Sequence, residues 1–273
     1  MSNQDDFGDR MKMYESTSTT RRAFKGQPLV VRLDGKNFHT FTKGLLRPFD
    51  KRLSDLMADT TKALVERFHA AFGYCQSDEI TLVWYYDSDS TAELPFKGRL
   101  QKIESLVAAF CSVYFNKKLA EFIPEKRDEM PTFDARAFQT PNLIEGYNAV
   151  LWRQQDCTKN AISMAAQSMF THKSLVGLNG RQMQARMLSE RDVNFNDYPA
   201  FFKRGVFVVR KTITAKLTPE EMTRIPEHRR DQHSGEFQRR VVEITDIWLG
   251  KLVNSGVQVL FFGEEPQYDS EFK

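Results

Sequence analysis

PLVVRLDGKNFH (Pro28–His39) and FGYCQSDEITLVWYY (Phe72–Tyr86) are the two stretches of this sequence that decide its fold. In the first, an apolar run ends at Asp34 and Gly35, so a carboxylate and a small, closely approachable backbone arrive together at the end of a strand. In the second, two β-prone runs flank Ser-Asp-Glu at residues 77–79, which predicts a hairpin with an acidic turn. Because such an acidic pair needs a neutralising cation, the two stretches together predict a divalent-metal site for nucleotide chemistry.

Periodicity around these stretches predicts a β-α-β-β-α-β order. Apolar residues recur at helical spacing in two segments, and Asp50 before the first and Gly73 after it are typical helix start and stop signals. We expect strands at Leu29–Leu33, Tyr74–Gln76, Ile80–Tyr86 and Thr132–Gln139, and helices at Lys51–Phe72 and Arg99–Phe122. This order is typical of an α+β, ferredoxin-like domain, in which an antiparallel sheet carries two long helices on one face.

The chain divides into three regions. Residues 1–24 begin with a polar, Ser/Thr-rich segment, which favours a flexible, loosely ordered arm. Residues 25–140 hold the ferredoxin-like domain, and residues 141–273 are expected to form a helix-rich region packed on it. Strand-like runs within this last region lie at Gly205–Thr214 and Val241–Trp248.

Composition excludes several classes of protein. The 273 residues are 41% hydrophobic and 27% charged, as in globular proteins with a sizeable core, and no apolar run approaches the ~20 residues of a bilayer span. Cys75, Cys111 and Cys157 are too widely spaced for a disulfide framework or a structural zinc site, so we expect small, partly buried thiols. The amino-terminal segment has no signal or transit character, which favours a cytoplasmic location.

A basic excess lies towards the carboxyl end. Residues 203–240 hold ten Lys or Arg against five Asp or Glu, although the whole chain has a formal net charge of only +3. Such a stretch is either a nucleic-acid surface or a solvated face, and charge alone does not separate the two. Candidate RNA or phosphate contacts in this stretch are Lys203, Arg229 and Arg230.

Asp34 and Asp78 are the predicted metal ligands, together with the carbonyl of Gly35. The first strand should neighbour the hairpin, so both carboxylates can approach one point. Mg²⁺ prefers oxygen ligands and keeps several waters, and two ions about 4 Å apart would activate a nucleophile and neutralise departing pyrophosphate. Glu79 is a weaker candidate, because adjacent residues in an extended chain point to opposite faces.

The loop after Asp34 is the predicted nucleotide site. Its backbone N–H groups, from Lys36 to His39, can wrap a triphosphate, and nearby cations can neutralise it. The candidate contacts are Lys36, Asn37, Phe38, His39, Arg47 and Ser77. Considered alone, Phe38 fits a core residue better than a base-stacking one, and core packing is also expected for Trp152.

With these motifs in place, the sequence resembles the tRNA-histidine guanylyltransferase family and its 3′-to-5′ polymerase relatives. The resemblance is carried, in order, by VVRLDGKNFHTF (Val30–Phe41), LLRPFDKRLSDLM (Leu45–Met57), YCQSDEITLVW (Tyr74–Trp84), LWRQQDCTKNAI (Leu151–Ile162) and FFKRGVFV (Phe201–Val208). It implies a catalytic domain similar to a polymerase palm, two Mg²⁺ ions, a homotetramer and the addition of nucleotides to the 5′ end of tRNA.

Position by position, the resemblance puts Asp34, the Gly35 carbonyl and Asp78 on the metal ions, with Glu79 as a further catalytic acid. It implies that a 5′-monophosphorylated RNA is activated with ATP and then attacked by the 3′-hydroxyl of GTP or another NTP. A triphosphorylated end would skip the activation.

One departure from the family bears on specificity. Eukaryotic members carry His-Ile-Asn-Asn after the WRQ-x-DC segment, whereas this chain has Thr-Lys-Asn-Ala at residues 158–161. This is similar to the bacterial, archaeal and organellar relatives, and it favours templated repair of 5′-truncated tRNA over non-templated addition to histidine tRNA. Three competing functions stay open: a palm-type nucleotidyl cyclase, a conventional 5′-to-3′ polymerase and a non-catalytic RNA-binding module.

Overall fold

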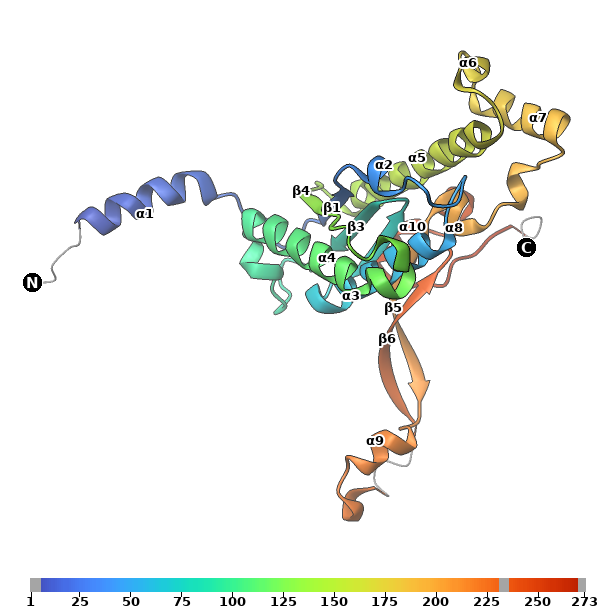
Figure 1. The fold of residues 1–273 in the computed structure, drawn as a ribbon. Helices are drawn as coiled ribbons and strands as arrows, with labels where there is room; N and C mark the ends of the chain where they lie inside the picture. The colour runs from blue at the N-terminus through green and yellow to red at the C-terminus, as the bar shows by residue number, and fades with distance from the viewer. Residues whose placement is uncertain (1–5, 231–235, 270–273) are drawn as a thin grey trace, which may run out of the picture.

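The computed structural model describes residues 6–230 and 236–269, whose main strands form one six-stranded antiparallel sheet (Figure 1). Its first four strands are β1 Leu29–Gly35, β2 Phe72–Gln76, β3 Glu79–Trp84 and β4 Phe133–Gln139. They stand in the order β4-β1-β3-β2, and every neighbouring pair is antiparallel. This is the strand order of a ferredoxin-like domain, so the predicted α+β fold is confirmed.

Two long helices pack on one face of this sheet and form the main core with it. They are α3 Lys51–Phe68 and α4 Leu100–Phe122. Asp50 caps α3 as expected, because its carboxylate accepts a hydrogen bond from the N–H of Arg52 at 3.1 Å. The predicted end of this helix was wrong: His69 takes a left-handed conformation with φ 54°, which stops the helix, and Phe72 and Gly73 belong to β2.

One long helix, α5 Leu143–Met169, covers the opposite face and contributes to a second core cluster with β1, β2 and β3. Buried Gln154 ties α5 to the chain after β6. Its side-chain amide donates to the carbonyl of Ile247 at 2.7 Å, and its oxygen accepts from the N–H of Leu249 at 2.8 Å. A short helix, α10 Gly256–Phe262, packs beside α5.

The carboxyl-terminal region extends the same sheet. β5 Val206–Ala215 pairs with β2, and β6 Phe237–Thr245 pairs with β5. The second of these strands begins and ends earlier than the predicted Val241–Trp248. Gly205 allows the entry into β5, since its φ is 71° and an added Cβ would lie 2.5 Å from the carbonyl oxygen of Cys75.

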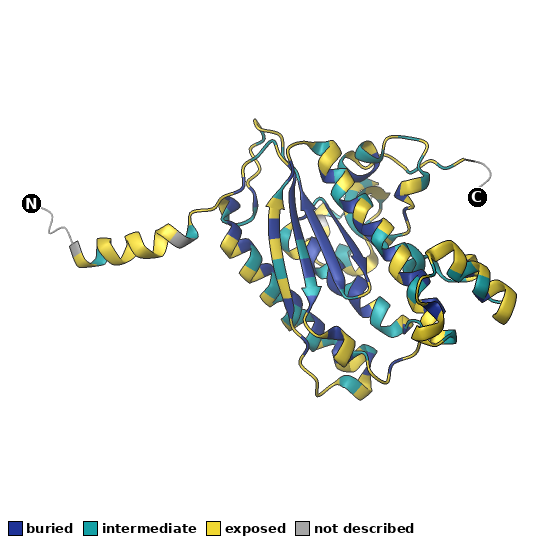
Figure 2. Ribbon diagram, turned by 90° about the horizontal axis from the view of Figure 1, so that it is seen from above, coloured by how far each residue is buried: buried dark blue, intermediate teal, exposed yellow. Residues whose placement is uncertain are grey.

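Two segments project from the body (Figure 1). Only residues 206–209 of β5 pair with β2, so the rest of the β5–β6 hairpin runs on past the sheet and carries α9 Pro219–Thr223. The other projection is α1 Asp6–Thr19, whose residues are mostly exposed, while the central strands are buried (Figure 2). Residues 6–19 of the predicted arm are therefore helical, and Phe7, Met11 and Tyr14 recur there at helical spacing.

A third cluster joins the carboxyl-terminal half of α5 to α6 His172–Leu175, α7 Gly180–Arg191 and α8 Ala200–Arg204. The remaining α-helix is α2 Phe38–Phe41, and short 3₁₀ helices lie at Pro95–Gly98, Pro124–Lys126, Phe195–Asp197, Glu227–Arg229 and Leu249–Lys251. The three cysteines are free, and they are buried rather than only partly buried as expected. In residues 6–230 and 236–269, no helix has the length and apolar character needed to cross a membrane.

Candidate active site

The hairpin between β2 and β3 brings its acidic turn beside the end of β1. The N–H of Gly35 donates to the carbonyl of Asp78 at 3.1 Å, and Asp34 stands opposite Glu79 in the β1–β3 register. Ser77 forms the turn with φ 47°, and its hydroxyl lies 3.1 Å from the Asp78 carboxylate, to which it donates. The segments that carry the two aspartates therefore meet where β1 ends and β3 begins, in the interior of the sheet.

Asp34 and Asp78 are close enough to influence each other electrostatically. Burial raises the pKa of the Asp78 carboxyl, and the negative charges of Asp34 and Glu79 raise it further, although the hydrogen bond from Ser77 opposes the rise. A bound cation would remove this repulsion, so the electrostatics of the turn favour a metal ion.

Mg²⁺ fits the donors that this turn offers. Among the residues that the structure describes, no three His, Cys, Asp or Glu side chains are grouped as a metal cage. Two carboxylates and the Gly35 carbonyl leave the remaining positions of an octahedral ion to water and phosphate oxygens. That division of ligands is typical of Mg²⁺ in nucleotide enzymes and differs from the closed sites of structural zinc.

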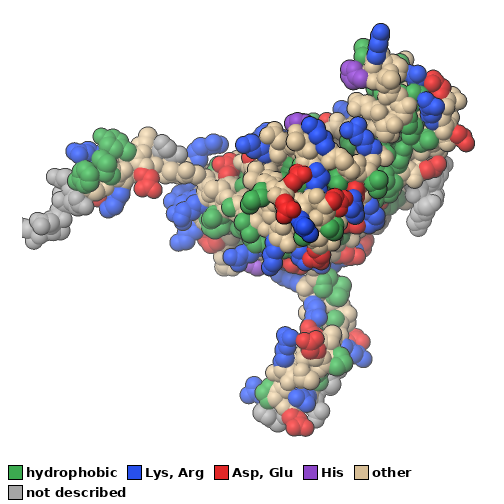
Figure 3. Space-filling view, viewed as in Figure 1, with side chains coloured by type: hydrophobic (Ala, Val, Ile, Leu, Met, Phe, Trp, Pro, Cys, Tyr) green, Lys and Arg blue, Asp and Glu red, His purple; other side chains and the backbone are tan. Residues whose placement is uncertain are grey.

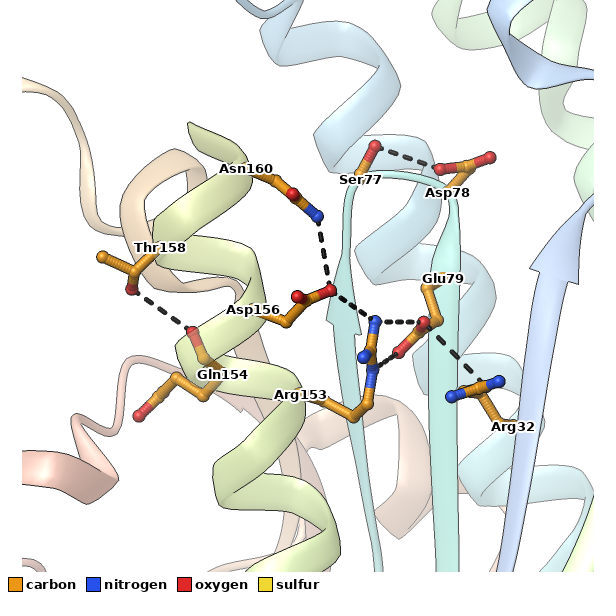
Figure 4. A network of polar contacts seen from close by, with 9 residues as sticks. All are labelled: Arg32, Ser77, Asp78, Glu79, Arg153, Gln154, Asp156, Thr158 and Asn160. Atoms are coloured by element: carbon orange, nitrogen blue, oxygen red, sulfur yellow. Dashed lines mark hydrogen bonds and ion pairs between the residues drawn. The ribbon is translucent and has the colours of Figure 1, made fainter. Parts of the chain in front are cut away.

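Glu79 turns away from Asp78 and towards α5 (Figure 4). Arg153 donates to both of its carboxylate oxygens at 2.7 Å and also donates to Asp156 at 3.0 Å. Arg32 Nε lies 4.0 Å from Glu79 Oε2. Glu79 thus holds β3 to α5 through a buried ion pair, in which Arg153 occupies one acceptor site on each of its carboxylate oxygens.

A cleft of about 630 Å³ opens beside Asp78. Its walls come from the loop after β1, the start of α3, the β2–β3 turn, the carboxyl-terminal half of α5 and α8. The sequence candidates that line it are Gly35, Asn37, Phe38, His39, Arg47, Ser77 and Asp78. At Gly35 an added Cβ would lie 2.2 Å from the ring of Phe38, so glycine lets the loop fold back on the strand. A volume of this size suits a nucleotide.

Two of the nucleotide candidates are engaged elsewhere. The ring of Phe38 is 3% exposed and packs against Phe115 and Phe133, so the expected core packing is confirmed. The N–H of Lys36 donates to the carbonyl of Thr132 at 2.8 Å. The expectation that this N–H wraps a triphosphate is therefore wrong, and the ammonium of Lys36 stays a candidate.

The candidate Lys203 lies in α8 with its ammonium turned towards the preceding loop. It donates to the carbonyl of Asn196, and burial lowers the pKa of the ammonium. This bond uses one of the three N–H donors of the ammonium, so Lys203 keeps donors for a phosphate contact.

In the described part of the basic stretch, residues 203–230 and 236–240, the cations do not form one continuous basic surface. Several of its cations have partners within the fold: Arg204 with Asp246, Lys211 with Glu243, Arg224 with Glu220, Arg239 with Glu221, and Arg210 with two backbone carbonyls. Arg229 and Arg230 lie near the tip of the projecting hairpin. Residues 216–236 hold four Lys or Arg against five Asp or Glu, and both kinds of charge are mixed along the hairpin (Figure 3).

Sequence reasoning missed three residues near the acidic turn. Arg153 partners Glu79, and Asp134 stands opposite Asp34 across the β1–β4 pair. Trp152 was expected in the core but is 54% exposed, because it lies beside Arg153 on the flank of α5, 4.5 Å from the guanidinium carbon to the ring centroid. Arg153 and Trp152 belong to the WRQQDC segment, which is the only sequence signal for them, and nothing in the sequence singles out Asp134.

Comparison with known proteins points to one family. A family model for tRNAHis guanylyltransferase matches residues 8–141. The tRNA(His) guanylyltransferase of Saccharomyces cerevisiae is 31% identical over 202 residues, which cover 67% of this chain and 82% of the relative. A bacterial tRNA(His) guanylyltransferase-like protein solved in complex with ATP superposes with a TM-score of 0.71 at 40% identity, over 75% of this chain and 88% of that one. A second bacterial structure, in complex with GTP, gives 0.66 at 32% identity, over 88% and 91%.

Proposed function

The chain belongs to the tRNAHis guanylyltransferase family of nucleotidyltransferases, and from this membership we propose that it adds nucleotides in the 3′-to-5′ direction to the 5′ end of tRNA. The proposed substrate is a 5′-truncated tRNA that is extended against its own opposite strand. The observation that supports the proposal is the backbone hydrogen bond that brings the segments of Asp34 and Asp78 together, beside a cleft of nucleotide size that Gly35 and Asp78 line. ATP and GTP, which the two bacterial relatives bind, are the proposed nucleotide substrates.

The proposed reaction has two steps. A 5′-monophosphate oxygen of the RNA attacks the α-phosphorus of ATP, which gives an adenylylated 5′ end and releases pyrophosphate. The 3′-hydroxyl of an incoming GTP or other NTP then loses its proton, attacks the 5′ phosphorus of the RNA and releases AMP. A triphosphorylated end enters the second step directly and releases pyrophosphate instead.

The proposed roles of the residues are consistent with their positions. Asp34, Asp78 and the Gly35 carbonyl would hold two Mg²⁺, which supply activation of the nucleophile and neutralisation of the leaving group. Arg47, which lines the cleft, and the ammonium of Lys36 would supply positive charge to the triphosphate, and the cleft residues Asn37, His39 and Ser77 would border it. We assign Glu79 a positioning role, because its pairing with Arg153 fixes the strand that follows Asp78.

Templated repair is the proposed form of the reaction, and non-templated addition to histidine tRNA is the competing one. Templated repair is supported by Thr-Lys-Asn-Ala at residues 158–161, because this segment resembles that of the bacterial, archaeal and organellar relatives. The hydroxyl of Thr158 donates to the carbonyl of Lys203 at 2.9 Å, whereas Asn160 lines the cleft. The yeast relative, by its name, acts on tRNA(His), and this supports non-templated addition. The homotetramer and the cytoplasmic location stay predictions.

The test is a 5′-extension assay. Purified protein is incubated with Mg²⁺, ATP, labelled NTPs and either a 5′-truncated tRNA or full-length histidine tRNA, and products are resolved on a sequencing gel. Growth of the truncated end with the NTP that matches the opposite base is the expected result. Addition of GTP to histidine tRNA regardless of that base would instead establish the non-templated reaction, and extension of neither RNA would contradict the proposal.

A further inference from the structure

Strand register sorts the charges on the α5 side of the sheet into two rows. Residues directly opposite each other on antiparallel strands share a face. Asp34 stands opposite Glu79 on β3 and Asp134 on β4, which makes a row of three acids. Two residues back along β1, Arg32 stands opposite Arg136, which makes an arginine row about 7 Å away.

The arginine row, Arg32 and Arg136, is unfavourable by itself, because like charges directly opposite each other repel. Arg32 Nε lies 4.0 Å from Glu79 Oε2, and Arg136 Nε lies 3.7 Å from Asp134 Oδ1. Both distances exceed hydrogen-bonding range, in contrast to the 2.7 Å contacts of Arg153 with Glu79. The Arg136 side chain is 59% exposed. An anion that bridged the two guanidinium groups would relieve the repulsion.

Trp152 adds an aromatic surface beside this row. The guanidinium carbon of Arg32 lies 5.9 Å from its ring centroid, and that of Arg153 lies 4.5 Å away. These cations hold the indole in place, yet more than half of the residue stays exposed. An exposed, pre-oriented indole beside guanidinium groups is the arrangement that single-stranded RNA recognition uses, with a base on the ring and phosphates on the cations.

The acidic turn separates this surface from the nucleotide cleft. Asp78 and Asn37 line the cleft, whereas Arg32, Arg136 and Trp152 lie outside it. An NTP in the cleft and the 5′ end of an RNA must meet at the carboxylates. The RNA strand therefore approaches the carboxylates from the side of the arginine row, which lies two residues before Asp34 along β1.

We propose that Arg32, Arg136 and Trp152 bind the 5′-terminal nucleotides of the RNA substrate, the arginines at the phosphates and the indole against a base. This inference rests on the proposed function and adds the path of the RNA to it. Guanidinium groups suit phosphate because they donate two parallel hydrogen bonds to it. The ligand is thus a phosphate chain with bases, and the site is distinct from the one that takes the triphosphate.

RNA binding without catalysis tests the surface directly. Fluorescence anisotropy of a 3′-labelled, 5′-truncated tRNA, without Mg²⁺ or NTP, measures affinity across a salt series. Arg136→Gln, whose side chain is exposed, should flatten the slope of log affinity against log salt by about 0.7, the value for one single-strand phosphate contact. Trp152→Ala should weaken binding roughly tenfold, and Trp152→Phe should preserve it. The matched control is Arg67→Gln, an exposed arginine on α3, across the sheet.

Base stacking provides a second readout. 2-Aminopurine at the 5′-terminal position of the RNA should be quenched by the wild-type protein and by Trp152→Phe, and not by Trp152→Ala. The same probe in the anticodon loop should be unaffected by both substitutions. In extension assays, Arg136→Gln should raise KM for RNA and leave KM for NTP unchanged.

The outcomes separate this inference from the proposed function. If the wild type extends RNA while Arg136→Gln and Trp152→Ala bind it as tightly as Arg67→Gln, the surface is wrong and the function stands. If these variants bind RNA more weakly but the wild type extends no RNA, the surface binds RNA and the proposed reaction is wrong. Quenching of the anticodon-loop probe alone would place another part of the RNA here and overturn the inference.

Discussion

Glu79 and Arg153 form an ion pair between β3 and α5, and each side chain is 11% exposed. We expect Arg153→Met to lower the free energy of unfolding by about 3 kcal/mol, because it leaves the Glu79 carboxylate buried without its bidentate partner. Urea unfolding measures this loss. The double variant with Glu79→Gln should recover part of it. Strictly additive losses in that double-mutant cycle would contradict direct coupling.

Asp34 and Asp78 make a second prediction at the scale of single residues. Asp34→Ala and Asp78→Ala should each lower the rate of nucleotide addition more than about 100-fold. Loss of a metal ligand should reduce activity more than loss of a residue that only contacts a ligand, which typically costs about 10- to 100-fold. The unfolding midpoint without metal should stay equal or rise in Asp78→Ala, since a carboxylate whose charge is disfavoured by burial and repelled by Asp34 is gone. Extension at the wild-type rate by either variant would disprove the metal assignment.

The sequence allowed prediction of some of these residues because their signals are local. Asp34 ends an apolar strand and Asp78 lies in a hairpin turn, and both features can be recognised within ten or so residues. Asp134 looks like any polar residue on an edge strand, and only the β1–β4 register places it opposite Asp34. The exposure of Trp152 depends on which flank of α5 the sheet covers, which periodicity does not show for a helix with apolar residues on several sides.

At the scale of elements, α3 depends on its amino-terminal cap. Asp50 accepts hydrogen bonds from the N–H groups of Arg52 and Leu46, and from the Arg52 guanidinium at 2.7 Å, and these bonds lower the pKa of its carboxyl. A depressed native pKa means that the stabilisation is present above the unfolded value, about 3.9, and is lost as the pH falls through the native pKa. Asp50→Asn keeps an acceptor for the helix but removes the charge.

The difference in unfolding free energy between wild type and Asp50→Asn should therefore be constant above about pH 5 and shrink below about pH 4. Urea unfolding of both proteins from pH 3 to 7 measures it. Because the two proteins share all other carboxylates, the contributions of these groups to the pH dependence cancel in the difference. A gap that is unchanged at pH 3 would contradict the role of the ionised cap.

The carboxyl end of α3 is held by β5. Arg210 donates to the carbonyl of Val65 at 2.6 Å and to that of Ala70 at 2.9 Å, so it satisfies a carbonyl in the last turn of the helix. Arg210→Met should lower the free energy of unfolding by about 2 kcal/mol without a change in KM for NTP. Arg240→Met, an exposed arginine on β6, is the control. Equal losses in the two variants would show that Arg210 acts only as surface charge.

Element order was predictable, whereas element ends were less so. The alternation of helical and extended patterns gave the β-α-β-β-α-β order, because each element has its own period. The end of α3 was missed because Ala70, Ala71 and Phe72 continue its apolar pattern, while the stop lies in the left-handed backbone of His69. A non-glycine residue in that conformation carries no reliable sequence signal.

At the scale of the whole molecule, one sheet unites the amino-terminal domain with the carboxyl-terminal region. β5 adds to β2, and the cluster beneath α5 contains residues from both regions. Within this sheet, the acidic turn has the cleft on one side and the arginine row on the other. The β5–β6 hairpin extends away from both, by about 20 Å for the six residues of β5 beyond the pairing with β2.

The length of the projecting hairpin leads to the last prediction. If Arg229 and Arg230 contact phosphates, they contact a part of the RNA that is remote from its 5′ end, since they follow α9 in the segment that joins β5 to β6 beyond the sheet. Arg229→Gln with Arg230→Gln should weaken binding of full-length tRNA and flatten its salt slope by about 1.5, while binding of a short acceptor-stem hairpin stays unchanged.

Replacing residues 216–236 with Asn-Gly gives an independent form of the test, because Ala215 and Phe237 are already paired and a two-residue turn can close them. The shortened protein should keep the wild-type unfolding midpoint and its activity on the short hairpin. A wild-type salt slope with full-length tRNA in both variants would make the tip a solvated face, as its mixture of four basic and five acidic residues also permits. The RNA contacts would then lie elsewhere, with the arginine row as the remaining candidate.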